Sequence, residues 1–187
     1  MFKLSRRDPA ARSTLPPLEG HGPEGAERAT FAAGCFWGVE AAFREIPGVL
    51  RTAAGYTGGY VPSPTYRQVC GHRTGHAEAV EVWFDPAQVS YARLLETFWR
   101  IHNPTTRHRQ GLDFGRQYRS AVFCHDAAQQ ALATASRDTE QRLRRRPVVT
   151  QIIPASAFYR AEEYHQRYRE KNGHASCAVT IGGQARG

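Results

Sequence analysis

The chain has few cysteines, no cysteine pair with the spacing of a metal site, and no long apolar run. Its four cysteines are Cys35, Cys70, Cys124 and Cys177. This is too few for a disulfide scaffold, and a reducing cytosol would keep them as thiols. No C-x-x-C pair occurs and the eight histidines are scattered, so we expect no zinc site and no other metal. Catalysis and core packing are the uses left for these cysteines.

A membrane span and a secretory signal are also missing. No segment approaches the roughly 20 consecutive apolar residues that cross a bilayer. The first residues contain the pair Arg6-Arg7, but no apolar segment follows it, which argues against a secretory or twin-arginine signal. We therefore expect a cytoplasmic protein with no membrane partner.

The chain carries a formal net charge of +8, and its densest basic cluster is the run RLRRR at 142–146. This run ends a predicted helix, where cations complement the helix dipole. Aromatic residues do not interleave with the basic ones, as a stacking platform for bases requires. We therefore expect no nucleic-acid partner.

The 187 residues, 41% of them hydrophobic, have the size and composition of one globular domain. We expect this domain to span residues 29–171 and to be a monomer. Residues 1–28 are rich in proline, glycine and charge, which predicts an irregular extension. Residues 172–187 are small, polar and rich in glycine, which predicts a flexible tail.

The periodicity of apolar residues predicts a mixture of strands and helices. Strands are predicted at 30–33, 49–56, 77–84, 118–124 and 148–153. Helices are predicted at 36–46, after Ser90, from Asp126 to about 145, and at about 157–171. Gly- and Pro-rich segments at 58–75 and 105–117 predict long loops. The absence of strict alternation favours an α+β two-layer domain.

Cys35 lies where a predicted strand passes into a predicted helix, between Gly34 and Phe36. Unpaired amides and the helix dipole lower the pKa of a thiol at a helix start, so we expect Cys35 to be more thiolate-like than a free cysteine. Nearby glycines allow a sharp turn and leave room for a ligand. The alternative is a small core residue packed beside aromatic side chains.

Glu78 lies in the predicted strand 77–84, and strand alternation places it on the same face as Val80, Val82 and Phe84. A carboxyl on that apolar face would be desolvated, which raises its pKa. It could then hold a proton at neutral pH and donate it. Alternatively, the strand begins one residue later and leaves Glu78 in solvent.

Tyr66 and Tyr118 lie in and at the end of the two predicted loops. A phenol is a neutral donor that can bind a polar S=O or C=O oxygen. The alternative for both is an ordinary half-buried aromatic residue.

Cys177 lies in the predicted flexible tail. A sulfenic acid formed on a nucleophilic cysteine needs a second thiol that can reach it and close a disulfide. Cys177 is the candidate for this resolving thiol. We interpret Cys70 and Cys124 mainly as packing residues, although a loop could also bring Cys70 near Cys35.

Three separated motifs, GCFWG at 34–38, TGHAEAV at 74–80 and the QGxDxGxQYRS pattern at 110–120, resemble those of the A-type peptide methionine sulfoxide reductases. The resemblance implies an α+β fold: a two-layer plait with a ferredoxin-like core and a mixed sheet. It implies reduction of the S epimer of methionine sulfoxide, free or in oxidised proteins, as repair of oxidative damage. No cofactor is implied, and thioredoxin is the implied reductant.

The resemblance also implies roles for individual residues around the thiol. Cys35 would be the nucleophile, and Phe36 and Trp37 would form the hydrophobic pocket for the S-methyl group of the substrate. Glu78 would protonate the sulfoxide oxygen. These roles agree with those argued from local chemistry.

Four further residues receive roles from the resemblance. Tyr66 and Tyr118 would hydrogen-bond the sulfoxide oxygen, Asp113 would support substrate binding, and Cys177 would be the recycling cysteine. Around Cys177 the chain reads Ala-Ser-Cys-Ala and no later cysteine follows. Relatives usually have Gly-Tyr-Cys-Gly there, so the departure concerns recycling more than the chemical step.

Three other functions are compatible with parts of the pattern. A cysteine hydrolase or acyltransferase needs a histidine base, for which His76, His102 and His165 are available. The triplet His76-Ala77-Glu78 is similar to that of zinc deaminases, whose P-C-x-x-C partner motif is missing. A redox sensor would form a regulatory disulfide between Cys35 and Cys177 without turnover.

Overall fold

The computed structural model describes residues 22–173. Most of the predicted N-terminal extension and tail, Cys177 included, lies outside these residues. The strands are β1 (Glu27–Ala33), β2 (Val49–Thr57), β3 (Ala77–Phe84), β4 (Arg109–Gln110), β5 (Asp113–Phe114), β6 (Ser120–Cys124), β7 (Gln151–Pro154) and β8 (Tyr159–Arg160). The helices are α1 (Phe36–Arg44), α2 (Tyr66–Cys70), α3 (Tyr91–Ile101), α4 (Ala127–Arg142) and α5 (Tyr168–Lys171), with 3-10 turns η1 (Arg116–Tyr118) and η2 (Glu163–His165). None of the described helices combines the length and apolar content of a membrane span.

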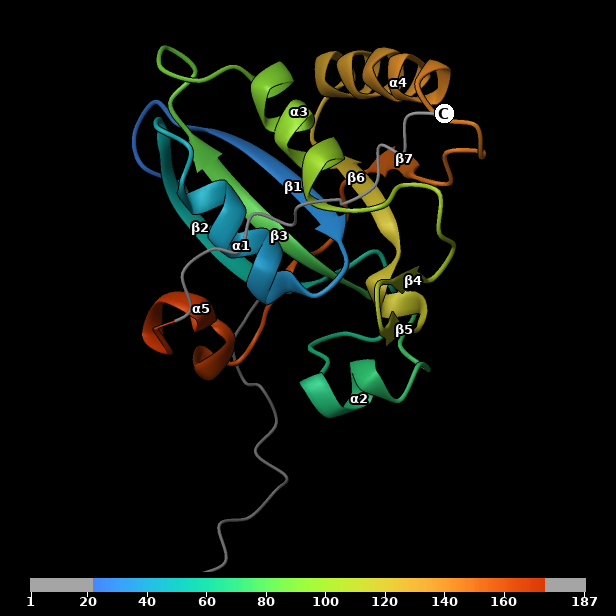
Figure 1. Ribbon diagram of the computed structural model, residues 1–187. Coiled ribbons are helices and arrows are strands. Elements are labelled where there is room, and N and C mark those ends of the chain that lie inside the picture. The colour runs from blue at the N-terminus through green and yellow to red at the C-terminus, as the bar shows by residue number, and fades with distance from the viewer. Residues whose placement is uncertain (1–21, 174–187) are drawn as a thin grey trace, which may run out of the picture.

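A six-stranded sheet in the order β7-β6-β1-β3-β2-β8 forms the centre of the molecule. β6 and β7 are parallel, and the other neighbouring pairs are antiparallel. Helices α1, α3 and α4 lie over one face of this sheet, and α2 lies near the small β4-β5 hairpin at one end of the molecule (Figure 1). The mixed α and β architecture with a mixed central sheet agrees with the sequence prediction.

The two faces of the sheet are covered differently. On the helical face, Val80 and Val82 of β3 pack in one cluster with Phe31 of β1 and Phe43 of α1. The opposite face carries many alanines, and the chain that runs from β7 to β8 packs Phe158 against them. β3 is therefore buried along its whole length, so any polar side chain on it is held away from solvent.

Two helix starts follow the predicted capping residues. The Ser90 side chain accepts a hydrogen bond from the Arg93 amide at 3.2 Å, and the Asp126 carboxylate accepts one from the Gln129 amide at 2.7 Å. Both caps satisfy amides that have no partner within the helix. The predicted starts of α3 and α4 are confirmed.

The two predicted loops contain short regular elements. Residues 66–70 form α2, whose N-cap Thr65 makes a capping box with Gln68. Arg109–Gln110 and Asp113–Phe114 form the β4-β5 hairpin. The strand predicted from residue 118 begins at Ser120, because the three residues before Arg119 form the turn η1.

The helix predicted at 157–171 is wrong. The Gln166 side-chain amide donates to the Ala54 carbonyl and accepts from the Ala54 amide, which holds the segment in an extended path along the edge of β2. Arg167 then adopts a left-handed conformation, with φ 53°, and its amide donates to the buried Glu40 carboxylate at 2.7 Å. These competing hydrogen bonds divide the segment into β8, η2 and α5.

Candidate active site

Cys35 is the N-cap residue of α1 and directly follows the turn that ends β1. Gly34 makes this turn with φ 98°, a conformation that favours glycine. Cys35 itself is only partly exposed. The structure therefore places the thiol at the strand-to-helix junction that the sequence indicates.

The pKa of Cys35 is raised to about 12, so the prediction of a lowered thiol pKa is wrong. Burial is the main cause, and the charge of Glu78, present once that carboxyl ionises, and the charge of Asp113 act in the same direction. The Phe36 amide at the helix start donates to Glu78 Oε2 at 3.1 Å. The carboxyl thus takes one of the helix-start amides, while the Trp37 amide bonds to the Cys35 sulfur and lowers its pKa without offsetting burial. Cys35 is a protonated thiol at neutral pH.

Glu78 is 1% exposed and points from β3 to the start of α1, as its strand parity predicts. Desolvation raises its pKa to about 8, and the charge of Asp113 adds to this effect. The Phe36 amide lowers the pKa but does not offset burial. Glu78 is therefore mostly protonated at neutral pH, in the state required of a proton donor.

Two aromatic side chains follow Cys35, and contacts with Tyr168 and His165 fix the second, Trp37. Phe36 is buried, with its ring 5.0 Å from that of His165. The Trp37 indole stacks on Tyr168 at 3.8 Å and donates from Nε1 to His165 Nδ1 at 2.9 Å. Since Nδ1 accepts, the neutral His165 ring carries its proton on Nε2. Burial lowers the pKa of His165 and favours this neutral form.

Tyr66 and Tyr118 both keep their phenol protons in this site. Tyr66 begins α2 with its ring 4.5 Å from His165. Burial raises its pKa, as does a hydrogen bond with the Cys70 thiol. Burial also raises the pKa of Tyr118, followed by the charge of Glu78. Both hydroxyls are therefore neutral donors.

Asp113 is exposed on β5, and its charge acts on Cys35, Glu78 and Tyr118. The structure thus brings Asp113 to the same site. Cys177 lies outside the described residues.

The other two cysteines are placed differently. Cys70 ends α2 and contacts the Tyr66 hydroxyl at the site, as the loop alternative in the sequence allowed. Cys124 is buried in the core at the end of β6, beside Tyr91. Packing is therefore a sufficient explanation for Cys124 but not for Cys70.

Glu162 is a site residue that the sequence reasoning missed. Its carboxylate accepts hydrogen bonds from the Tyr56 hydroxyl and from the Tyr66 amide, both at 2.9 Å. It thereby ties α2 to the segment that precedes α5. Residues 158–166 fall within the helix predicted from sequence, and a helical path does not indicate that the Glu162 side chain faces the site.

The three histidines proposed as a hydrolase base have other partners. His102 bonds the Phe98 carbonyl and Ser120, His76 bonds the Val61 carbonyl, and His165 accepts from Trp37. Within residues 22–173, no hydrogen bond joins a histidine to Cys35. This geometry does not support a cysteine hydrolase.

Comparison with known proteins gives the class to which this site belongs. The family model described as peptide methionine sulfoxide reductase matches residues 27–186. The chain belongs to this family, which confirms the resemblance and the enzyme class expected from the sequence. A relative from Methanosarcina acetivorans, described as peptide methionine sulfoxide reductase MsrA, is 52% identical over 91% of this chain and 92% of its own.

Solved structures give the same result. The reduced form of Mxr1 from Saccharomyces cerevisiae is similar with a TM-score of 0.79 and 34% identity, over 86% of this chain and 93% of that one. Mxr1 in complex with Trx2 is similar with a TM-score of 0.59 and 26% identity, over 82% and 92% of the two chains.

Proposed function

We propose that this chain reduces the S epimer of methionine sulfoxide, free or in peptides and proteins, to methionine, and that Cys35 is the attacking thiol. The observation that carries this proposal is the hydrogen bond that holds the protonated Glu78 carboxyl against the start of α1, beside Cys35. A sulfoxide bound there would meet a sulfur nucleophile and a proton donor together. Membership of the family supports this assignment.

The chemical step balances with the protons that the two groups hold. The Cys35 sulfur attacks the sulfoxide sulfur while Glu78 gives its proton to the sulfoxide oxygen. The thiol proton of Cys35 replaces the one that Glu78 has lost. The oxygen passes to Cys35 as a sulfenic acid, and methionine leaves. A raised thiol pKa is compatible with this step, because the thiol need ionise only as Glu78 donates.

The substrate contacts follow from the side chains around these two groups. Phe36 and Trp37 receive the S-methyl group, as the family resemblance implies: the partly exposed Trp37 supplies accessible aromatic surface near Cys35, and the buried Phe36 directly follows the thiol. Tyr66 and Tyr118 hydrogen-bond the sulfoxide oxygen as neutral donors. Asp113, exposed on β5 at the edge of the site, supports binding of the part of the substrate outside its sulfoxide group.

Recycling uses a second thiol and an external reductant. The Cys177 thiol attacks the sulfenic acid, releases water and forms a disulfide with Cys35. Thioredoxin then reduces this disulfide by thiol exchange and is itself oxidised. The solved complex of Mxr1 with Trx2 supports thioredoxin as the reductant. The biological role is repair of oxidised proteins, and a cytoplasmic location stays the prediction from sequence.

The finer description of the fold is a ferredoxin-like plait. Its support is the antiparallel order β6-β1-β3-β2, in which α1 joins β1 to β2 and α3 lies between β3 and β6 in the chain. The domain expected at 29–171 holds this unit except for Glu27 and Arg28, which begin β1 and pair with β3, so the domain boundary is moved to residue 27. Residues 172–187 are the tail that carries Cys177.

The proposed function is tested by offering S and R epimers of a sulfoxide peptide to the wild-type chain and to Cys35→Ser, with dithiothreitol as reductant. Only the wild type is expected to produce methionine, and only from the S epimer. Methionine production by Cys35→Ser, or equal reduction of both epimers, would refute the assignment.

A further inference from the structure

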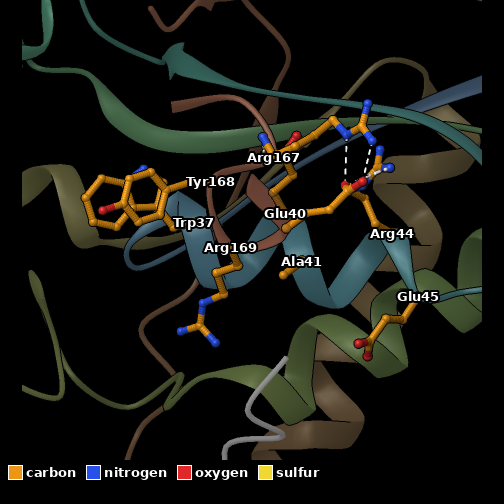
Figure 2. Close-up of a pocket in the computed structure, with 9 residues that line it drawn as sticks. Trp37, Glu40, Ala41, Arg44, Glu45, Arg167, Tyr168 and Arg169 are labelled. Atoms are coloured by element: carbon orange, nitrogen blue, oxygen red, sulfur yellow. Dashed lines mark hydrogen bonds and ion pairs between the residues drawn. The ribbon is translucent and has the colours of Figure 1, made fainter. Parts of the chain in front are cut away.

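A cavity of about 330 Å³ lies between α1 and α5, next to the Trp37 ring (Figure 2). Its lining is rich in charged side chains. The charged residues that line it are Glu40, Arg44, Glu45, Arg167, Arg169 and Glu170. Trp37 also lines this cavity, so the cavity adjoins the aromatic pocket of the proposed reaction.

Most basic groups of this cavity have acidic partners. Arg44 pairs with Glu170 at 3.3 Å, and Arg167 pairs with the same carboxylate. Within residues 22–173, no hydrogen bond or ion pair joins the Arg169 guanidinium to another side chain. In Figure 2 this guanidinium extends away from the Arg44 and Arg167 groups. Arg169 thus lines the cavity without an ion-pair partner among the described residues, while three acidic side chains also line it and one of them, Glu170, is paired with Arg44 and Arg167.

Arg169 also lies close to the reacting thiol. Its Nη2 atom would lie 3.2 Å from a Cβ atom at Gly38, so the glycine leaves the space that the guanidinium uses. Gly38 is in the first turn of α1 after Cys35, and the positive charge of Arg169 acts on that thiol. A group bound by Arg169 would therefore lie near the substrate sulfoxide.

We propose that Arg169 binds a carboxylate of the substrate and makes the enzyme prefer methionine sulfoxide with an acidic neighbour. This inference rests on the proposed function. A guanidinium can bind a carboxylate through two parallel hydrogen bonds. An extended peptide advances about 3.5 Å per residue, so a residue next to the sulfoxide can reach from the aromatic pocket to the adjoining cavity.

The test compares kcat/KM for matched sulfoxide peptides that differ in one neighbour of the sulfoxide, aspartate or asparagine, with both termini blocked. The acidic peptide is expected to be the better substrate of the wild type, and Arg169→Gln is expected to lower the ratio of acidic to neutral kcat/KM by about two- to fivefold, the range of a partly exposed ion pair. Arg169→Glu is expected to reverse the preference. Arg137→Gln, on α4, is the control and keeps the wild-type ratio.

Two sources of the carboxylate are distinguished in the same assay. A peptide that ends in methionine sulfoxide with a free carboxylate is compared with its amide. If Arg169→Gln changes only the ratio of kcat/KM between the free-carboxylate peptide and its amide, Arg169 binds the α-carboxylate. If it changes the ratio between the aspartate and asparagine peptides, Arg169 binds an acidic side chain. If both ratios are unchanged while the peptides are still reduced, the inference is wrong and the proposed function stands. Failure of the wild type to reduce any of these peptides refutes the proposed function.

Discussion

At the scale of single residues, the site is defined by a competition for the amides at the start of α1. Sequence alone indicates that these amides stabilise a Cys35 thiolate. In the structure the Phe36 amide is bonded to Glu78, and burial dominates the pKa of both groups. The result is a thiol and a carboxyl that both hold protons at neutral pH. Activation of the thiol is therefore linked to proton donation by Glu78.

Replacing Glu78 with Gln is expected to raise stability at alkaline pH. The folded pKa of Glu78, about 8, is above its ordinary value of 4.5. The carboxyl therefore destabilises the fold progressively as pH rises from 4.5 to 8. Above pH 8 the gain in the free energy of unfolding in Glu78→Gln is expected to be on the order of a few kcal/mol, at about 1.4 kcal/mol per pKa unit. Urea unfolding at pH 5 and pH 9 measures it, and an equal effect at both values would contradict the account.

The same substitution is expected to lower kcat by about 100-fold or more, because general acid catalysis contributes at least that factor. Glutamine can keep the bond to the Phe36 amide but cannot donate a carboxyl proton. The matched control is Glu81→Gln, since Glu81 is an equally buried carboxyl of β3 on the opposite face of the sheet, paired with Arg28. Single-turnover rates of methionine formation separate the two variants. Similar rates in both would show that Glu78 is not the proton donor.

At the scale of elements, the segment from β8 to α5 completes one wall of the site. Gln166 is buried, and its side-chain amide bonds to the backbone of Ala54 in β2 in the way that a neighbouring strand would. The same amide also donates to the Ala161 carbonyl. Two residues later, Tyr168 stacks on Trp37. The position of the Trp37 ring thus depends on an irregular segment that is fixed mainly by tertiary hydrogen bonds.

Gln166→Ala is expected to loosen this wall. Loss of a buried hydrogen-bonded group costs about 1–3 kcal/mol, and freer motion of Tyr168 and Trp37 should raise KM more than it lowers kcat. Chemical unfolding and steady-state kinetics measure both effects. Gln130→Ala, at an exposed position of α4, serves as the matched control. A Gln166→Ala enzyme with unchanged stability and KM would show that the segment does not position the pocket.

The elements differ in how well sequence predicts them. α1, α3 and β3 have clear periodicity, and their caps or turn residues mark their ends, so their positions were predicted closely. α2 was not predicted, because it lies in a segment dominated by glycine and proline. Its capping box of Thr65 and Gln68 is recognisable in the sequence. The segment at 157–171 has helical composition, but tertiary bonds to Ala54 and Glu40 override it.

At the scale of the whole molecule, the site combines parts that are far apart in the sequence. Cys35 comes from the first strand-helix junction, Glu78 from a central strand, Tyr118 from the turn before β6, and His165 from the segment before α5. Motif resemblance identifies the first three. The placement of His165 and Glu162 at the site depends on the path of the chain across the sheet, which the local sequence pattern does not determine.

The recycling step joins this site to the tail. Cys177→Ser is expected to give one methionine per chain in the absence of reductant, as the wild type does, but to lose thioredoxin-supported turnover. The reason is that the sulfenic acid would lack its resolving thiol. Unchanged cycling in Cys177→Ser, combined with loss in Cys70→Ser, would transfer the resolving role to Cys70, whose contact with Tyr66 places it at the site.

The most direct test of the central claim is to locate the oxygen after a single turnover. A variant that keeps only Cys35 among its cysteines would be mixed with the S epimer of a sulfoxide peptide without reductant, then trapped with a sulfenic-acid reagent and analysed by mass spectrometry. The account predicts one methionine released per chain and one trapped sulfenic acid on Cys35. Release of methionine without modification of Cys35, or no release at all, would contradict it.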